Sequence, residues 1–222
     1  RVFQVGESQF VNAYMAFGNI CGQGANTLQF HYGQSTGNRL DVCGSTILDA
    51  DTWYHVVFNG TGDSNDYNFY VNGVEETMTY GNVGAPIFPT GTNQELFIGT
   101  NYVMTSEFLD ADLQDLNKYD RTLSLSEITA LYQSGAPTQL MRDIDSTGLV
   151  YNNSLTYNKG NVMVFDGDTN YLNAGTLPTG NFSIAFWGKV NDDGSDGAFL
   201  GDSPGLNGHP DGLYVYYYNP DD

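Results

Sequence analysis

Four stretches between Trp53 and Tyr119 have the mixture of apolar, aromatic and single polar residues that is typical of β-strands. Each is rich in β-branched and aromatic residues, and Gly, Asn or Asp bounds each of them; the stretches are residues 53–58, 67–73, 95–99 and 111–119. Successive side chains of a β-strand point to opposite faces of a sheet. The pattern therefore predicts a run of β-strands.

The pattern changes after Tyr119, where the chain has the signals of one short helix. Ser124 is a suitable N-cap, and Glu127, three residues later, completes a capping box. Ile128 and Leu131 then share one helical face, and Gly135 offers a left-handed exit. We expect a single short helix near 124–134.

These elements also carry specific motifs. The chain has a W-x-H-V segment from Trp53 to Val56, a Y-V-N-G hairpin from Tyr70 to Gly73, and an Ile98-Gly99 pair; the closing segment runs from Leu113 to Tyr132 and contains Tyr-Asp-Arg-Thr-Leu-Ser. Together they resemble the end of a jelly-roll domain of the concanavalin A-like lectin/glucanase superfamily, in particular the laminin G-like and pentraxin-like domains. The resemblance implies an all-β fold, an antiparallel β-sandwich.

Residues 161–190 resemble the start of the same domain, although they follow its end. A short repeat supports this order: residues 3–8 resemble residues 198–203, and Ser8 and Ser203 are 195 residues apart. Two interpretations remain open, a window cut across a tandem array and a permuted or strand-exchanged single unit. Both divide the chain in the same way. Residues 1–140 form the C-terminal part of one jelly roll, 141–148 a linker, and 149–222 the N-terminal part of a following or permuted one.

The composition supports this fold class and excludes some classes of binding partner. Sixteen Tyr and 27 Gly favour a sandwich in which large rings fill the space between sheets and Gly turns the corners. The formal net charge of −19 repels nucleic acids and anionic membranes. No apolar run approaches a membrane span in length, so membrane insertion is not expected. An acidic surface can bind divalent cations or keep the protein soluble in salt.

Asp166, Asp168 and Asn170 place oxygen ligands at alternate positions, as calcium loops do. The segment is not an EF-hand, because Tyr171 stands where that loop requires Gly. Laminin G-like and pentraxin-like relatives often bind calcium at the sandwich rim, so the resemblance implies calcium as a cofactor here. The alternative is a polar hairpin turn between two strands.

The two cysteines, Cys21 and Cys43, flank the strand at residues 28–32, so their own strands could be neighbours in one sheet. They form either a disulfide or two buried free thiols. A zinc site is excluded, because two thiols without a nearby His pair do not complete a tetrahedral set.

The aromatic cluster near residue 216 is a candidate ligand-binding surface. Alternation sends Tyr214, Tyr216 and Tyr218 to one face of a strand. Exposed rings there would stack on a sugar or on a partner protein, whereas buried rings would fill the inner face of the sandwich.

Catalysis has a weaker basis in the sequence. Asp110, Asp112 and Asp115 imitate the three-acid spacing of some glucanases of this superfamily, but they lie in the closing strand and no Glu is available as the acid. His55 belongs to the W-x-H-V strand, where we expect a hydrogen-bonded structural histidine. The sequence therefore predicts no enzyme, with a glycoside hydrolase as a remote alternative.

The function predicted from these features is a non-enzymatic binding or adhesion module of a repeated extracellular or particle-surface protein. It would recognise glycans or proteins, or neighbouring copies of itself, with the assistance of calcium. The alternative is an architectural subunit of a virion appendage, a capsid decoration or an extracellular filament. Either role places the protein outside the cell or on a virion surface.

Overall fold

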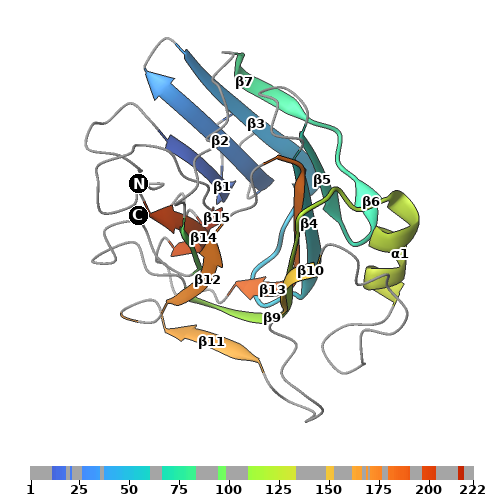
Figure 1. Ribbon diagram of the computed structural model, residues 1–222. Coiled ribbons are helices and arrows are strands. Elements are labelled where there is room, and N and C mark those ends of the chain that lie inside the picture. Colours follow the sequence, from blue (N-terminus) through green and yellow to red (C-terminus); the bar gives the residue numbers. More distant parts are fainter. Residues whose placement is uncertain are drawn as a thin grey trace.

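The computed structural model describes residues 12–18, 21, 27–35, 38–60, 67–83, 95–98, 110–133, 149–152, 162–166, 169, 171–176, 180–190, 197–203 and 215–217. These residues form two β-sheets that pack face to face, with one helix outside them (Figure 1). The predicted all-β sandwich with one short helix is confirmed.

The larger sheet has eight strands. In spatial order they are β12 (Leu172–Thr176), β8 (Glu95–Ile98), β14 (Gly197–Ser203), β15 (Val215–Tyr217), β1 (Asn12–Gly18), β2 (Thr27–Ser35), β3 (Asn38–Ile47) and β7 (Thr79–Val83).

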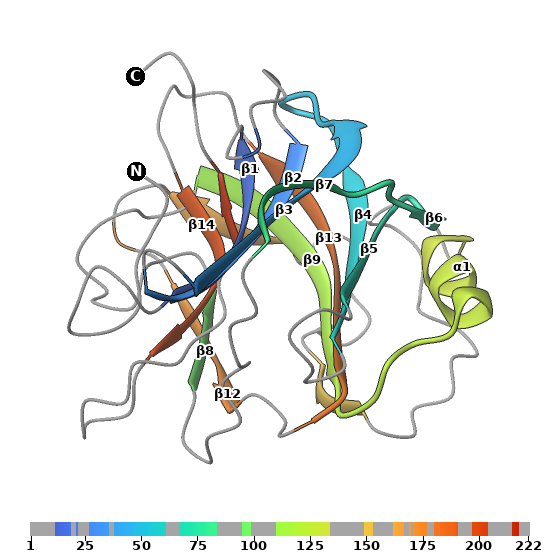
Figure 2. The ribbon, with the colours of Figure 1, turned by 90° about the horizontal axis from the view of Figure 1, so that it is seen from above.

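The smaller sheet has seven strands. In spatial order they are β10 (Leu149–Asn152), β9 (Asp110–Tyr119), β13 (Phe182–Val190), β4 (Tyr54–Gly60), β5 (Tyr67–Val71) and β6 (Val74–Glu75), with β11 (Met163–Asp166) paired to β9 beside this path. Seen from above, the two sheets form separate layers (Figure 2).

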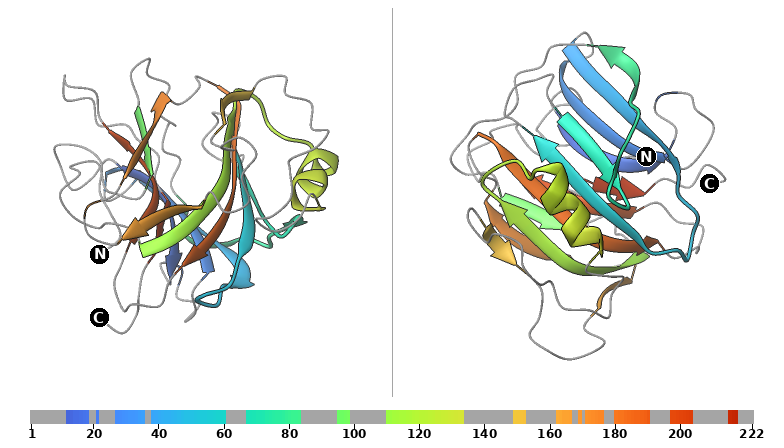
Figure 3. Two further views of the ribbon diagram at one scale, coloured as in Figure 1. Left: turned by 90° about the horizontal axis from the view of Figure 1, so that it is seen from below. Right: turned by 90° about the vertical axis from the view of Figure 1, so that its right-hand side faces the viewer.

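The helix α1 (Leu125–Gln133) lies across the outer face of the smaller sheet (Figure 3). Its start is the predicted capping box: the Ser124 backbone N–H donates to Glu127 Oε2 at 2.8 Å, and the Glu127 N–H donates to Ser124 Oγ at 3.4 Å. The Arg121 guanidinium donates two hydrogen bonds to the same carboxylate, at 3.1 and 2.6 Å. The hydrogen bonds from Arg121 are the largest cause that lowers the pKa of Glu127 to about 2.

Loss of the helix cap should have a measurable cost. Ser124→Ala removes the oxygen that accepts the Glu127 N–H, and we expect the free energy of unfolding in urea to fall by about 1 kcal/mol. Ser124→Thr is the matched control, because it keeps a hydroxyl at the cap and should lie close to the parent protein. Equal stability of the alanine variant and the parent would show that the cap contributes nothing.

The predicted Tyr70–Gly73 hairpin joins β5 to β6. Asn72 and Gly73 have φ angles of 51° and 77°, the left-handed conformations of a two-residue hairpin turn. The turn is tied to β4, because the Asn72 N–H donates to the His55 carbonyl at 2.8 Å and the His55 N–H donates to Asn72 Oδ1 at 2.9 Å. A Cβ on Gly73 would lie 3.1 Å from the Tyr132 ring, so glycine also allows the helix to approach.

Two apolar clusters bury the faces of the smaller sheet. One lies between the sheets and is centred on Phe58, whose ring lies 5.7 Å from Tyr67, 5.5 Å from Phe69 and 5.6 Å from Phe182. The other lies under α1; its members are Val57, Tyr70, Tyr119, Leu123, Ile128, Leu131 and Ala185. The inner cluster holds the sheets together, and the outer cluster holds the helix.

A buried polar network fixes the chain as it leaves β9. Asn59 Nδ2 donates to the Leu123 carbonyl at 2.8 Å, and the Leu123 N–H donates to Ser183 Oγ at 2.9 Å. Ser183 Oγ in turn donates to the Arg121 carbonyl at 2.9 Å. Buried polar groups need such partners, so this network positions the start of the helix against β4 and β13.

Strands from both predicted segments share both sheets. In the smaller sheet β13 lies between β9 and β4, and in the larger sheet β14 pairs with β8. The predicted linker, 141–148, lies outside the described residues. The assignment of residues 1–140 and 149–222 to successive or permuted domains stays a prediction.

Candidate functional site

The predicted calcium loop lies where the chain passes from one sheet to the other. β11 pairs with β9 in the smaller sheet, and the next strand, β12, pairs with β8 in the larger one. The segment 164–171, which we call the rim crossover, is therefore not the hairpin turn considered as the alternative. It bridges the two layers because its two strands find their partners in different sheets.

Asp166 organises the described part of this crossover. Its Oδ1 accepts the Thr169 N–H at 2.9 Å and its Oδ2 accepts the Thr169 hydroxyl at 3.2 Å. This is the local side-chain-to-backbone bonding that Asp commonly makes in turns. Asp168 and Asn170 lie outside the described residues, so the three-residue calcium set stays a prediction.

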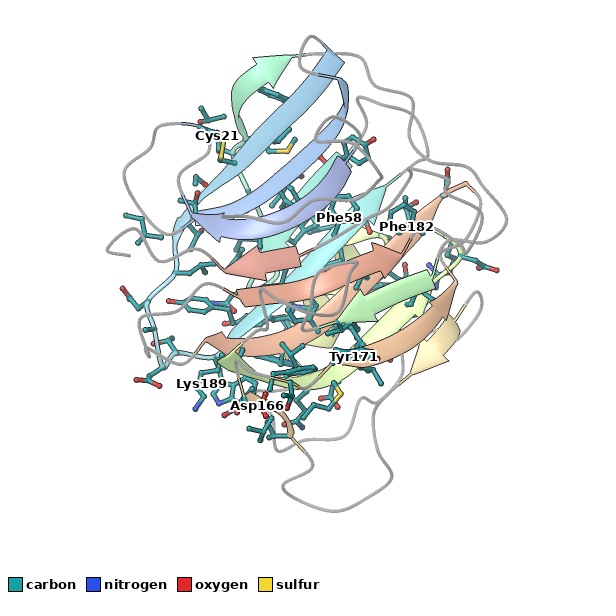
Figure 4. All side chains as sticks on the ribbon, turned by 90° about the vertical axis from the view of Figure 1, so that its left-hand side faces the viewer. Cys21, Phe58, Asp166, Tyr171, Phe182 and Lys189 are labelled. Atoms are coloured by element: carbon teal, nitrogen blue, oxygen red, sulfur yellow. A yellow bond between two sulfur atoms is a disulfide. The ribbon has the colours of Figure 1, made fainter. Side chains whose placement is uncertain are left out.

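The rim crossover exposes apolar surface on both sides of the Asp166 turn. Val164 is 63% exposed and Tyr171 is 46% exposed. Val164 lies opposite Asp112 in the β11–β9 register, and Lys189 lies opposite Asp112 in the β13–β9 register. Lys189 Nζ and Asp112 Oδ2 form an ion pair of 2.9 Å with both side chains mostly buried. Figure 4 shows Asp166 and Lys189 at the same edge of the sandwich.

The three acids of the glucanase-like spacing do not form a regular row. Asp112 is held by Lys189, and Asp115 has a φ of 52°, at the place where the β13–β9 register shifts. A bulge of this kind breaks the two-residue alternation on which the row depends. Burial raises the pKa of Asp115. The side chain of Asp110 lies outside the described part of the structure.

His55 lies in an aromatic cluster beneath the end of α1. Its ring centre is 5.3 Å from that of Trp187 and 6.2 Å from that of Tyr132, and those two rings stack at 5.9 Å. The expected hydrogen bond of the side chain is not found at Nδ1, which is buried and has no partner among the described residues. Burial lowers the pKa of His55 to about 4, so the ring is neutral at physiological pH. The contacts described for the His55 side chain are packing contacts with the rings of Trp187 and Tyr132.

Of the remaining predicted residues, Cys43 and Tyr216 lie in strands of the larger sheet, β3 and β15. Cys21 and Cys43 form a disulfide with a Cα–Cα distance of 6.1 Å, and Figure 4 places Cys21 at the end of the view opposite Asp166. Tyr216 lies in β15, where its backbone pairs with Ala16 and Ala198. Tyr214 and Tyr218, and the side chain of Tyr216, lie outside the described structure, so the ligand-binding row stays a prediction.

Two features of the rim were not found from the sequence. The Lys189–Asp112 ion pair joins residues 77 positions apart, and no local pattern announces it. The exposure of Val164 and Tyr171 follows from the crossover between sheets. Only the alternation within 162–165 could have suggested that Val164 faces away from the core, because Phe165 faces into it.

Among the described residues, no group of three His, Cys, Asp or Glu side chains converges to hold a metal ion. No helix in that part of the chain is long and apolar enough to span a membrane.

Comparison with known families agrees with this architecture. Residues 4–129, more than half of the chain, match a laminin G-like family model described as the concanavalin A-like lectin/glucanases superfamily. No curated protein and no solved structure matches the chain.

Proposed function

The chain belongs to the concanavalin A-like lectin/glucanases superfamily, and from this membership we propose that it is a non-enzymatic binding or adhesion module of an extracellular or particle-surface protein. It recognises glycans or proteins at the rim crossover. Lectins and glucanases share the superfamily, so the choice between binding and hydrolysis depends on the site and not on the fold.

The observation that supports binding is the composition of the rim. In sequence, an exposed tyrosine and an exposed valine flank a carboxylate turn, and the valine lies opposite Asp112, the partner of Lys189. Sugars present apolar faces and hydroxyl groups, and they are held by aromatic rings together with hydrogen-bonding charged groups. A protein ligand would use the same exposed apolar surface.

The acids argue against hydrolysis. A glycosidase needs two carboxyl groups at a fixed separation, one able to donate a proton and one able to attack or activate water. Here Asp112 is occupied by an ammonium group and Asp115 is displaced by a bulge. This arrangement supports a site that binds its ligand without cleaving it.

An extracellular or virion-surface location is supported by two properties. The Cys21–Cys43 disulfide and the laminin G-like family are both consistent with a secreted protein. The net charge of −19 disfavours nucleic acids and anionic membranes as partners.

The rim can be tested for glycan binding with two tyrosine variants. The parent protein should bind a subset of glycans on an array, and Tyr171→Ala should weaken that binding by about tenfold or more, since one stacked ring contributes on the order of 1.5 kcal/mol. Tyr80→Ala is the matched control, because Tyr80 is 48% exposed but lies in β7, far along the larger sheet. Equal loss in both variants, or no loss in either, would exclude the rim as the ligand site.

Calcium is the cofactor we propose for the same crossover. Binding to the folded state alone stabilises it by about 2.7 kcal/mol at a hundredfold excess over Kd, so the melting temperature should rise by several degrees in millimolar calcium. Asp166→Asn should reduce this rise, whereas Asp120→Asn, an exposed aspartate before α1, should not. A melting temperature that is the same in calcium and in chelator would remove calcium from the proposal.

A further inference from the structure

One strand pairing in the larger sheet differs from all the others. β1 and β15 pair in parallel, whereas every other pairing between described strands is antiparallel. The parallel contact spans three residue pairs, and the antiparallel contact of β1 with β2 spans seven. A jelly-roll sandwich is built from antiparallel strands, so the parallel contact needs an explanation.

The register of the parallel pair supplies one. Met15 pairs with Val215, Ala16 with Tyr216 and Phe17 with Tyr217, so each residue lies beside the residue 200 positions further along. A short sequence match has the same interval: residues 13–19 read Ala-Tyr-Met-Ala-Phe-Gly-Asn and residues 213–219 read Leu-Tyr-Val-Tyr-Tyr-Tyr-Asn, with a Tyr and an Asn shared. β15 is therefore the sequence counterpart of β1, and the two copies lie side by side.

The sequence of β14 also resembles an earlier stretch of the chain. Residues 3–8 resemble residues 198–203 within β14, at an interval of 195 residues. The stretch between the two resembling segments is therefore five residues longer in the second copy.

The directions of the strands show that either β1 or β15 could occupy the same position in the sheet. β15 is antiparallel to β14, and β1 is antiparallel to β2. Because β1 and β15 run in the same direction, either strand alone could lie between β14 and β2 and be antiparallel to both. One strand in this direction would be enough to join β14 to β2, yet the sheet contains two, β15 and β1.

We propose that β1 and β15 are alternative occupants of the single position beside β2, and that β15 fills this position in a second copy of the chain. In the exchanged arrangement Val215 takes the place of Met15 opposite Phe30, and Tyr217 takes the place of Phe17 opposite Leu28. We choose a second copy as the partner because it contains β2, the strand that pairs with β1, and β15 shares the register of β1. Addition of a strand to a sheet in this way is a known mode of recognition.

The contact joins different surfaces of the two copies, the β15 of one and the β2 of the other. Such a contact is heterologous and does not close on itself in a dimer, so copies would associate head to tail. A strand of the same chain has a higher effective concentration beside β2 than a strand of another copy. The monomer is therefore favoured as long as β1 can pair with β2.

Proline pairs test whether the strands are equivalent. Two adjacent prolines remove the N–H groups that point to both sides of a strand. Met15→Pro with Ala16→Pro disables β1, and Val215→Pro with Tyr216→Pro disables β15. Each pair alone should lower the melting temperature by less than about 10 °C, because the other strand takes the position. All four prolines together should abolish cooperative unfolding.

Phe30→Pro with His31→Pro is the control in β2, which has no second copy among the described strands and should not tolerate the change. The equivalence is wrong if either proline pair in β1 or β15 is as damaging as this control. It is also wrong if the four-proline chain melts as the single pairs do.

Mixing then tests the second copy as the partner. The four-proline chain has an empty position, so the parent protein, which has an intact β15, should rescue it into a folded complex detected by native mass spectrometry. The variant with prolines only in β15 should fail to rescue it, although its β1 is intact and its fold is retained. Rescue by both donors, or by neither, would overturn the proposed exchange.

Discussion

Replacing Phe182 by alanine should lower the free energy of unfolding by about 4 kcal/mol, the largest effect we expect from a single substitution. Phe182 is 0% exposed, and its ring packs 5.6 Å from that of Phe58 on the neighbouring strand. A Cβ on Gly60 would lie 2.9 Å from the Phe182 ring, so the packing around it is close. The loss combines the transfer of a large apolar side chain with the cavity that remains.

Urea unfolding measures this loss, with Tyr80→Ala as a control that removes a ring of similar size from the surface. Tyr80 is 48% exposed, and its removal should cost less than about 1 kcal/mol. The comparison also tests the interleaving of the two segments, since Phe182 belongs to residues 149–222 and Phe58 to residues 1–140. A cost below 1 kcal/mol for Phe182→Ala would mean that β13 does not occupy the core between β4 and β9.

The second large effect is a loss of stability in acid that comes from His55. Burial lowers the pKa of His55 from 6.5 to about 4, so between these values the unfolded chain binds a proton that the folded chain does not. Stability is therefore fully present above pH 6.5 and falls as the pH is lowered toward 4. We expect this one residue to account for about 3 kcal/mol between about pH 7.5 and pH 4, from 1.36 kcal/mol per unit of pKa difference.

His55→Phe isolates this contribution, because phenylalanine keeps an aromatic ring beside Trp187 and does not titrate. Urea unfolding should show the stability of the parent falling by about 3 kcal/mol relative to that of the variant as the pH is lowered from about 7.5 to 4. Carboxylates affect both proteins alike and cancel in the difference. Parallel curves would show that the pKa of His55 is the same in the folded and the unfolded protein.

Much of the fold follows from local sequence. The strands at 53–58, 67–73 and 111–119 and the helix after Ser124 all form where their patterns predict them. Alternation, β-branched residues and a capping box act over two to four residues, so their effect can be read without knowing the tertiary contacts. The Asn72-Gly73 turn is predictable for the same reason.

The candidate site was less accessible to this reasoning. The alternation of Asp166, Asp168 and Asn170 predicted a calcium loop, which stays a prediction, and it did not show that the chain passes from one sheet to the other here. Asp115 was grouped with Asp112 by strand spacing, and a bulge separates them. His55 was expected to make a side-chain hydrogen bond; its Nδ1 has no partner in the described structure, and its ring packs against Trp187.

The sequence by itself determined the strand and helix segments, the acidic surface and the family, because these depend on composition and on neighbours within a few residues. Only the tertiary structure decided which strands pair, which charges meet and which copy of the repeated strand lies beside which. The Ser183–Asn59 hydrogen bond joins residues 124 positions apart, and the buried Glu76 carboxylate receives the Ser45 and Thr46 N–H groups from 30 or more positions away. Such contacts form only when the closed sandwich brings distant segments together, and the chain between them contains no local signal of the meeting.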